Sequence, residues 1–161
     1  MLKLCKKEKD FLFILDNLRD EDYQELNALW GSSWKENTLN GLKNAEVLVL
    51  YGKNSENKQI PIAMGGFYEQ FDKSSKIACV WLLTTKYIKY NKSALMRVLK
   101  EQIELAETKY SLMYNHIYKA NIQAKLWLRK LGFCFDNPKP KALNVPKDFE
   151  FFYKIIKRKE Y

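Results

Sequence analysis

The chain has 161 residues and a formal net charge of +9, and hydrophobic residues make up 47% of it. This length and composition fit one folded domain spanning residues 1–161 and exclude an intrinsically disordered protein. No apolar run is long enough to cross a bilayer or to serve as a secretion signal, so we expect a cytoplasmic protein without a membrane partner.

The N-terminal part of the sequence predicts one strand and two helices. Residues 11–15 form a short apolar run bounded by polar residues, which favours a first strand. Residues 20–30 form an amphipathic helix that Asp20 can cap and that ends before Gly31. Residues 33–41 begin with the Ser-x-x-Glu spacing of a capping box and predict a second helix. The inward face of the first helix is expected to hold Tyr23, Leu26, Leu29 and Trp30.

The middle of the chain predicts three strands separated by turns. Apolar residues predict these strands at 46–51, 62–68 and 77–84. Two glycines in the second of them, Gly65 and Gly66, leave little side chain and would let a ligand or another backbone segment come close. The third strand is apolar on both faces and is therefore expected near the centre of the sheet. Polar residues at 72–75 predict a hairpin turn.

The C-terminal half predicts two further helices. Residues 85–92 form a polar loop that leads into a helix at residues 93–108. Residues 120–131 form another amphipathic helix, which Gly132 ends in a left-handed cap. Short strands are predicted at residues 112–113, 133–135 and 149–156. The order of strand, two helices, three strands, helix, strand, helix and two strands predicts a mixed sheet with helices on its faces.

The segment that follows the predicted strand at 112–113 carries the most informative pattern. Asn121, Ala124, Gly132 and Phe133 keep a spacing that resembles the fourth helix and following strand of the GNAT N-acetyltransferase superfamily. The order of elements along nearly the whole chain is similar to that superfamily as well. The resemblance implies an α/β (α+β) fold, with a GNAT-like mixed central sheet of about six to seven strands flanked by about four helices.

The resemblance also implies a cofactor, because members of the superfamily bind an acyl-coenzyme A. Its pantetheine arm pairs with the central fourth strand, and its pyrophosphate rests on N–H groups that open the following helix. Acetyl-CoA would then lie along Leu82, Leu83 and Thr84. The loop pattern of the superfamily, Arg/Gln-x-x-Gly-x-Gly/Ala, would correspond to Lys89, Tyr90, Asn91, Lys92, Ser93 and Ala94, with Asn121 completing the set.

Two positions depart from the superfamily pattern. Lys92 stands where the middle glycine of the loop belongs, and lysine resists the positive-φ conformation, although its charge could hold a phosphate. Leu128 stands where many members carry a tyrosine that protonates the leaving thiolate, and leucine cannot donate a proton. Tyr114 and Tyr118 lie nearby in the sequence. The departures leave open a catalytically inactive protein with the same fold.

Two residues are candidates for the base that deprotonates an amine substrate. Glu69 lies at the end of a predicted strand, and His116 lies just past another. Histidine titrates in the range that is useful for proton transfer near neutral pH. His116 could equally be a surface or capping histidine, and Asn115 and Asn121 could each satisfy backbone groups at a turn from strand to helix.

The positive charge implies an anionic partner, which could be the phosphates of a nucleotide cofactor, nucleic acid or an acidic protein. The lysines are scattered and outnumber the arginines, unlike the cations of a protein that reads DNA bases. A solvated lysine-rich surface is the simplest explanation. The odd number of cysteines predicts free thiols, and a single histidine argues against a histidine-based metal site.

A narrower resemblance is to a GNAT-like family encoded by short-tailed bacteriophages, which includes internal virion proteins. The shared patterns are Ala78-x-x-Trp81-x-Leu83-x-Thr85-Lys86, Leu112-x-Tyr114-Asn115 and Trp127-Leu128-x-x-Leu131-Gly132-Phe133. This resemblance implies virion components or DNA as partners, besides an acyl-CoA and an unknown amine. It also implies a location in the cytoplasm of a bacterial host or in the virion.

Overall fold

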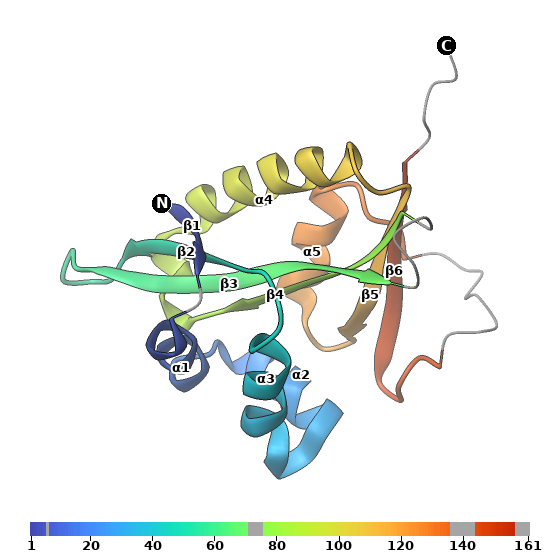
Figure 1. Cartoon of the computed structure of the whole chain (residues 1–161). Coiled ribbons are helices and arrows are strands. Elements are labelled where there is room, and N and C mark those ends of the chain that lie inside the picture. Colours follow the sequence, from blue (N-terminus) through green and yellow to red (C-terminus); the bar gives the residue numbers. More distant parts are fainter. Residues whose placement is uncertain (6, 71–75, 136–143, 157–161) are drawn as a thin grey trace. The chain divides into compact units, whose positions relative to one another are not determined.

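The computed structural model describes residues 1–5, 7–70, 76–135 and 144–156 (Figure 1). The strands are β1 (Leu2–Cys5), β2 (Val47–Lys53), β3 (Gln59–Gln70), β4 (Ile77–Thr84), β5 (Leu112–Tyr118) and β6 (Phe149–Ile155). The helices are α1 (Glu8–Asp16), α2 (Asp20–Trp30), α3 (Trp34–Leu42), α4 (Lys92–Glu107) and α5 (Ile122–Lys130), with 3₁₀ turns η1 (Gly31–Ser33) and η2 (Lys86–Tyr90). The hairpin turn expected at residues 72–75 lies outside the described residues.

The six strands follow the order β1-β2-β3-β4-β5-β6 in a mixed sheet, which confirms the predicted fold class. β4 and β5 are parallel, whereas the pairs β1–β2, β2–β3 and β5–β6 are antiparallel. The chain divides into two compact units. Unit 1 comprises Met1–Gly66 and Trp81–Val98, and unit 2 comprises Phe67–Val80 and Leu99–Tyr161.

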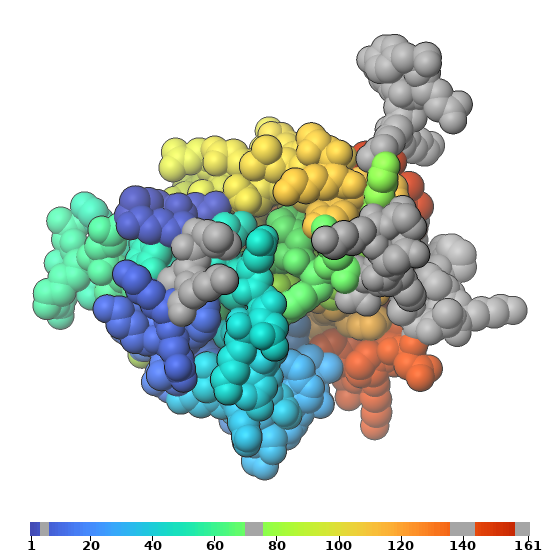
Figure 2. All heavy atoms as spheres, in the orientation of Figure 1, coloured from blue at the N-terminus to red at the C-terminus, as the bar shows by residue number. Residues whose placement is uncertain are grey.

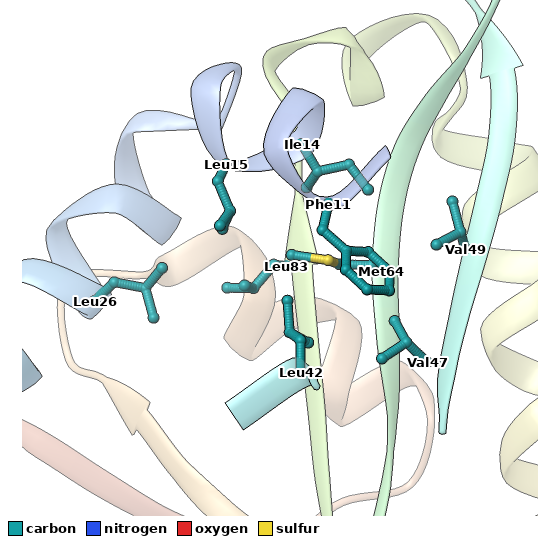
Figure 3. Close-up of a cluster of buried hydrophobic side chains, with 9 residues drawn as sticks. All are labelled: Phe11, Ile14, Leu15, Leu26, Leu42, Val47, Val49, Met64 and Leu83. Carbon is teal, nitrogen blue, oxygen red and sulfur yellow. The ribbon is translucent and has the colours of Figure 1, made fainter. Parts of the chain in front are cut away.

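Each unit has its own hydrophobic core. In unit 1, side chains of α1, α2 and α3 pack on β2, β3 and β4; this core contains Phe11, Ile14, Leu15, Leu26, Leu42, Val47, Val49, Met64 and Leu83 (Figure 3). In unit 2, residues of α4 pack against β4, β5 and β6; this core contains Ala78, Val80, Ile103, Ala106, Tyr110, Met113, Ile117, Phe133 and Phe152. The buried stripe of α4 has the helical period that the sequence predicted.

The strand predicted at residues 11–15 is wrong, because this segment belongs to the helix α1. Phe11, Ile14 and Leu15 are its buried residues, at the i, i+3 and i+4 spacing of a helix face. The apolar run was too short to distinguish a strand from a buried helix segment by periodicity alone. The first strand is β1, in a segment for which the sequence predicts no secondary structure.

The helix α2 has the predicted bounds, but most of its expected inward face is exposed. Leu26 is buried, whereas Tyr23, Leu29 and Trp30 are exposed. Figure 2 shows the segment from α2 to α3, in light blue and cyan, at the molecular surface. The predicted inward face is wrong for these three residues, because the helix buries a narrower stripe than its apolar content suggests. Single exposed apolar residues are normal on a protein surface.

The two glycines of β3 fulfil the prediction of a close backbone approach. A Cβ atom at Gly65 would lie 2.6 Å from the carbonyl oxygen of Trp81, and one at Gly66 would lie 2.7 Å from that of Glu46. Real Cβ atoms do not approach backbone oxygens so closely. The glycines therefore permit close packing of backbone against β3 within unit 1.

The C-terminal elements differ from the predictions in length. β5 continues to Tyr118, beyond the residues 112–113 that were expected, because polar Asn115 and His116 interrupt the apolar pattern without ending the strand. Cys134 forms only an isolated bridge with Tyr153, and this replaces the strand expected at 133–135. Gly132 has a φ of 84°, which confirms the left-handed helix end predicted there.

Candidate functional site

The hydrogen bonds at the end of β4 distinguish its two edges. The N–H and the hydroxyl of Thr85, the residue after β4, both donate to the carbonyl of Ile62 on β3, at 2.9 and 3.0 Å. Successive residues of a strand present their N–H and C=O groups to opposite edges, so the main-chain groups of Leu82 and Thr84 face away from β3. The Leu83 side chain is buried in the core of unit 1. The edge that could pair with a ligand is therefore the edge of Leu82 and Thr84.

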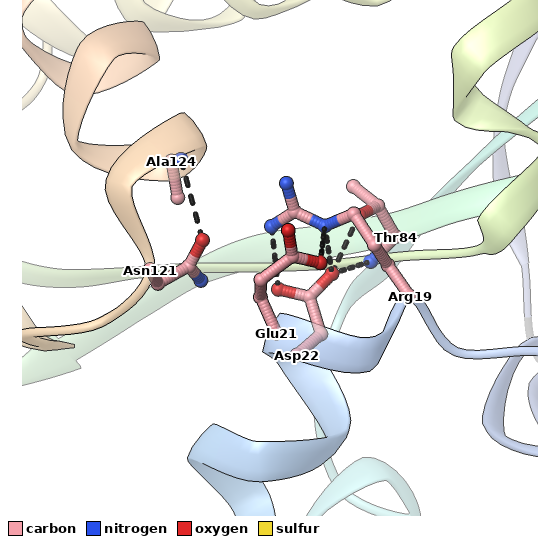
Figure 4. Close-up of polar contacts among 6 residues, drawn as sticks. All are labelled: Arg19, Glu21, Asp22, Thr84, Asn121 and Ala124. Carbon is pink, nitrogen blue, oxygen red and sulfur yellow. Dashed lines mark hydrogen bonds and ion pairs between the residues drawn. The ribbon is translucent and has the colours of Figure 1, made fainter.

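The polar groups of Thr84 on this edge are already bonded within unit 1 (Figure 4). Its N–H and its hydroxyl both donate to Asp22 Oδ2, at 3.0 and 2.5 Å. Its carbonyl accepts from the N–H of Arg19 at 3.0 Å. The guanidinium of Arg19 in turn lies 3.1 Å from Asp22 Oδ1. Thr84 is 1% exposed as a result.

The segment that makes these contacts joins α1 to α2, and we call residues 17–22 the α1–α2 strap. Leu18 forms an isolated antiparallel bridge with Thr85. The N–H of Lys86 donates to the carbonyl of Asn17 at 2.9 Å. The strap is therefore bonded to the end of β4 and to the residues that follow it.

The polar side chain in the middle of the predicted phosphate loop supports the local structure. Asn91 Nδ2 donates to the carbonyls of Lys53 and Tyr87, at 2.9 and 3.2 Å, and its Oδ1 accepts from the Lys53 N–H at 3.3 Å. Asn91 thus ties the end of β2 to the loop before α4. The loop itself contains the 3₁₀ turn η2, whose Ile88 is buried, where the sequence predicted only a polar loop.

The opening of α4 is the part of unit 1 best suited to an anion. The N–H of Leu95 donates to the carbonyl of Asn91, so the N–H groups of Lys92, Ser93 and Ala94 precede the first intrahelical bond. α4 has no acidic residue in its first turn. Lys92 and Ser93 are exposed there. These N–H groups and the positive end of the helix dipole favour a bound anion.

Three lysines lie in or just before the first turn of α4: Lys86 and Lys89 in η2, and Lys92 at the start of the helix. Lys86 lies over the Tyr87 ring and Lys89 lies over the Tyr90 ring, at 5.5 and 5.0 Å from the ring centres. Within the described part of the chain, neither these lysines nor Lys92 forms an ion pair with an acid. Cations beside a helix N-terminus repel its dipole, so an anion bound here would relieve an unfavourable local charge.

In unit 2, His116 lies inside β5 and not past its end. The His116 ring contacts the ring of Phe151, its register partner on β6, at 5.8 Å. His116 Nε2 is buried and has no hydrogen-bond partner among the described residues. Burial lowers the pKa of His116 below its ordinary value. The imidazole is therefore neutral at pH 7 and can accept a proton.

Tyr114 shares a strand face with His116, because side chains two residues apart point to the same side. Its ring also contacts Phe151, at 5.8 Å. Burial, and to a lesser degree the neighbouring Cys79, raise the pKa of Tyr114 above its ordinary value. At pH 7 the Tyr114 hydroxyl therefore keeps its proton, and the His116 imidazole is uncharged. Both pKa shifts have the same main cause, because burial disfavours the charged form of each group.

Cys79 is the register partner of Tyr114 on β4, and burial raises its pKa to about 11. We expect iodoacetamide at pH 8 to modify the exposed Cys134 first and Cys79 roughly a hundredfold more slowly, since only the thiolate reacts. Peptide mass spectrometry over time measures both rates. Equal rates would show that the Cys79 thiol is not shielded from solvent in this way.

Glu69, the other candidate base, has a different environment. It lies near the end of β3 and is exposed. The hydroxyl of Tyr110 donates to Glu69 Oε1 at 3.4 Å. Glu69 is thus hydrogen-bonded and open to solvent, whereas His116 Nε2 is buried and has no partner among the described residues.

Asn115 and Asn121 both form hydrogen bonds to backbone groups, which is the structural alternative that the sequence allowed. Asn121 caps α5, since its Oδ1 accepts from the N–H of Ala124 at 3.3 Å, and it is buried (Figure 4). Asn115 Nδ2 donates to the carbonyl of Val80 at 2.7 Å. That bond follows the three residue pairs that join β4 to β5, of which Cys79 with Tyr114 is the last. Beyond that pair, the Asn115 side chain, and not a main-chain pair, links β5 to β4.

The residues that close the edge of β4 carry no signal in the sequence that links them to this strand. Arg19 and Asp22 are separated from Thr84 by more than 60 residues. The acidic run at residues 20–22 signals only the start of a helix, where acids are generally favourable. No local pattern identifies the distant strand edge that Asp22 contacts.

The described ranges lack two further features, a membrane-spanning helix and a cluster of metal ligands. No helix there is long and apolar enough to span a membrane. No group of three or more histidine, cysteine or acidic side chains in these ranges could hold a metal ion.

No family model and no curated protein matches the sequence of the chain. Solved structures do resemble it. An acetyltransferase of the GNAT family from Streptococcus pneumoniae is 15% identical with a TM-score of 0.62, over 97% of this chain and 99% of that one. A ribosomal-protein-alanine N-acetyltransferase from Brucella melitensis is 16% identical with a TM-score of 0.61, over 96% of this chain and 99% of that one.

A third similar structure contains its ligands. It is a spermidine N-acetyltransferase from Vibrio cholerae in complex with CoA and spermine, 10% identical with a TM-score of 0.60, over 97% of this chain and 95% of that one. These likenesses show that the chain has the fold of GNAT N-acetyltransferases, as the sequence predicted.

Proposed function

We propose that the chain is an N-acetyltransferase that transfers the acetyl group of acetyl-CoA to an unidentified amine. The observation that carries the proposal is the opening of α4. There, N–H groups that precede the first intrahelical bond lie at the start of α4 with Lys92, just after the 3₁₀ turn η2 that contains Lys89. The likeness in fold to solved N-acetyltransferases, one of them with CoA bound, supports it.

The residues of unit 1 fit acetyl-CoA in part. The first turn of α4 fits the pyrophosphate, because it offers the N–H groups of Lys92, Ser93 and Ala94 and nearby positive charge. Leu82 and Thr84 have the edge that an amide-containing arm would pair with. The Thr84 N–H, however, is bonded to Asp22, so this part of the edge does not fit the arm as it stands.

Unit 2, taken by itself, contains the candidate base His116. Acetyl-CoA brings an activated thioester carbonyl, which an amine can attack directly. His116 Nε2 is neutral and buried without a partner among the described residues, so it can take the proton of the amine. Leu128 cannot protonate a leaving thiolate, and the raised pKa of Tyr114 makes its hydroxyl a weaker proton donor than an ordinary tyrosine. Leu128 packs against the core of unit 2.

Calorimetric titration with acetyl-CoA tests the cofactor site. We expect the native protein to bind it and the Lys92→Asp variant to bind at least about tenfold more weakly, because the substitution puts an acid beside the phosphates. Lys100→Asp is the matched control. It reverses an exposed charge on the same helix and changes the net charge equally.

The proposal is refuted if millimolar acetyl-CoA produces no heat of binding and no thermal shift. Equal weakening by Lys92→Asp and Lys100→Asp would mean that the overall charge, and not the opening of α4, attracts the cofactor.

A second candidate is a non-catalytic GNAT-fold protein of a bacteriophage that acts in the host cytoplasm or the virion and binds virion components or DNA. The bonded state of Thr84 and the substitutions at Lys92 and Leu128 favour it. Fluorescence anisotropy with duplex DNA at increasing salt tests the DNA part. A steep loss of affinity with salt supports phosphate contacts, because these release counterions.

A further inference from the structure

The contacts of the α1–α2 strap concentrate on one short stretch of strand edge. The N–H and hydroxyl of Thr84 donate to Asp22, and its carbonyl accepts from Arg19. The N–H of Lys86 donates to Asn17, and Leu18 bridges to Thr85 between these bonds. The strap thus adds a short antiparallel segment to the end of β4. Extended peptides bind open sheet edges by the same main-chain pairing.

Asp22 is an unusual anchor for such a segment. It is the third residue of α2, where an acid ordinarily stays hydrated and interacts with the helix dipole. Here it is 5% exposed and accepts two hydrogen bonds from Thr84. The Arg19 guanidinium compensates its charge, which a buried carboxylate requires. The carboxylate therefore satisfies donor groups that an amide oxygen of a bound ligand would otherwise satisfy.

We propose that the α1–α2 strap is an autoinhibitory element that closes the edge of β4 and that acetyl-CoA must displace. This inference rests on the proposed function, which places the arm of acetyl-CoA on Leu82 and Thr84. The single N–H of Thr84 cannot donate fully to the strap and to the arm at once. The apparent affinity for acetyl-CoA is then reduced by the fraction of molecules in which the strap is closed.

Substitution of Asp22 tests the proposal. Asp22→Ala removes the acceptor of both Thr84 donors, and Asp20→Ala removes an exposed acid from the same helical turn as a matched control. We expect calorimetry to show that Asp22→Ala binds acetyl-CoA at least about tenfold more tightly than the native protein, with Asp20→Ala unchanged.

The outcomes separate the inhibitory element from the proposed function. Equal affinity of the native protein and Asp22→Ala overturns the inhibitory role and leaves the proposed function intact. Absence of binding in both folded proteins overturns the proposed function, and the inhibitory role with it.

A measurement on the native protein tests displacement of the strap even if Asp22→Ala does not fold. Hydrogen–deuterium exchange is followed by mass spectrometry with and without saturating acetyl-CoA. Displacement predicts faster exchange in peptides covering residues 17–22 and slower exchange at the start of α4. Bound acetyl-CoA that leaves exchange at residues 17–22 unchanged or slower contradicts the proposal.

Discussion

Gly65→Ala is expected to destabilise the protein by about 3 kcal/mol, at the upper end of what overpacking a core generally costs. The added Cβ would lie 2.6 Å from the carbonyl oxygen of Trp81, a backbone atom that cannot rotate away. Met64, the preceding residue, belongs to the core of unit 1, so β3 cannot shift without disturbing that core. For a chain of this length the change corresponds to a fall in Tm of roughly 6–12 °C.

Gly41→Ala is the matched control for this experiment. Gly41 lies in the helix α3, and a Cβ there would meet nothing within 4 Å. Alanine is favoured over glycine in a helix by about 1 kcal/mol, so this variant should be as stable as the native protein or more stable. Thermal unfolding followed by circular dichroism measures both. If Gly65→Ala melts with the native protein, the close approach of Trp81 to β3 is incorrect.

His116→Gln is expected to lower kcat for acetyl transfer by at least about a hundredfold, the usual range for removal of a general base. The acid limb of the native pH profile should lie below pH 6.5, because burial lowers the pKa of His116 from its ordinary value of about 6.5. The affinity for acetyl-CoA should not change. Steady-state kinetics with a panel of amines, combined with calorimetry, measures the two effects separately.

The same pKa shift affects stability in a defined direction. The unfolded chain takes up a proton near pH 6.5, whereas folded His116 does so only at lower pH. The contribution of His116 to the free energy of unfolding is therefore complete above pH 6.5 and falls as the pH drops through that value. His116→Gln should remove this part of the pH dependence. A native acid limb above pH 6.5, or unchanged kcat in His116→Gln, would exclude His116 as the base.

Local chemistry explains which elements could be predicted. β4 was predicted with its observed bounds because an eight-residue apolar run is typical of a buried strand. The ends of α2 were also predictable, because acidic residues mark its start and Gly31, which has a positive φ, follows its end. The run at residues 11–15 failed because Phe11, Ile14 and Leu15 fit a helix face as well as a strand.

The candidate site was less accessible to prediction, because it depends on contacts between distant residues. The opening of α4 could be located from its position after β4 and from its small and basic residues. The burial of His116, and the absence of a partner for its Nε2 among the described residues, depend on the pairing of β5 with β6, which no local pattern predicts. The contact of Asp22 with Thr84 joins residues 62 positions apart, and only the fold brings them together.

The closed edge of β4 also affects whether the protein stays soluble and folded when no ligand is bound. An open strand edge is a template for pairing with another copy of the chain, and it is a common origin of aggregation. The strap supplies the missing hydrogen-bond partners at Thr84 from within the same molecule. A descendant that no longer met its ligand would thus keep a protected sheet, and its fold could persist and be recruited for another task.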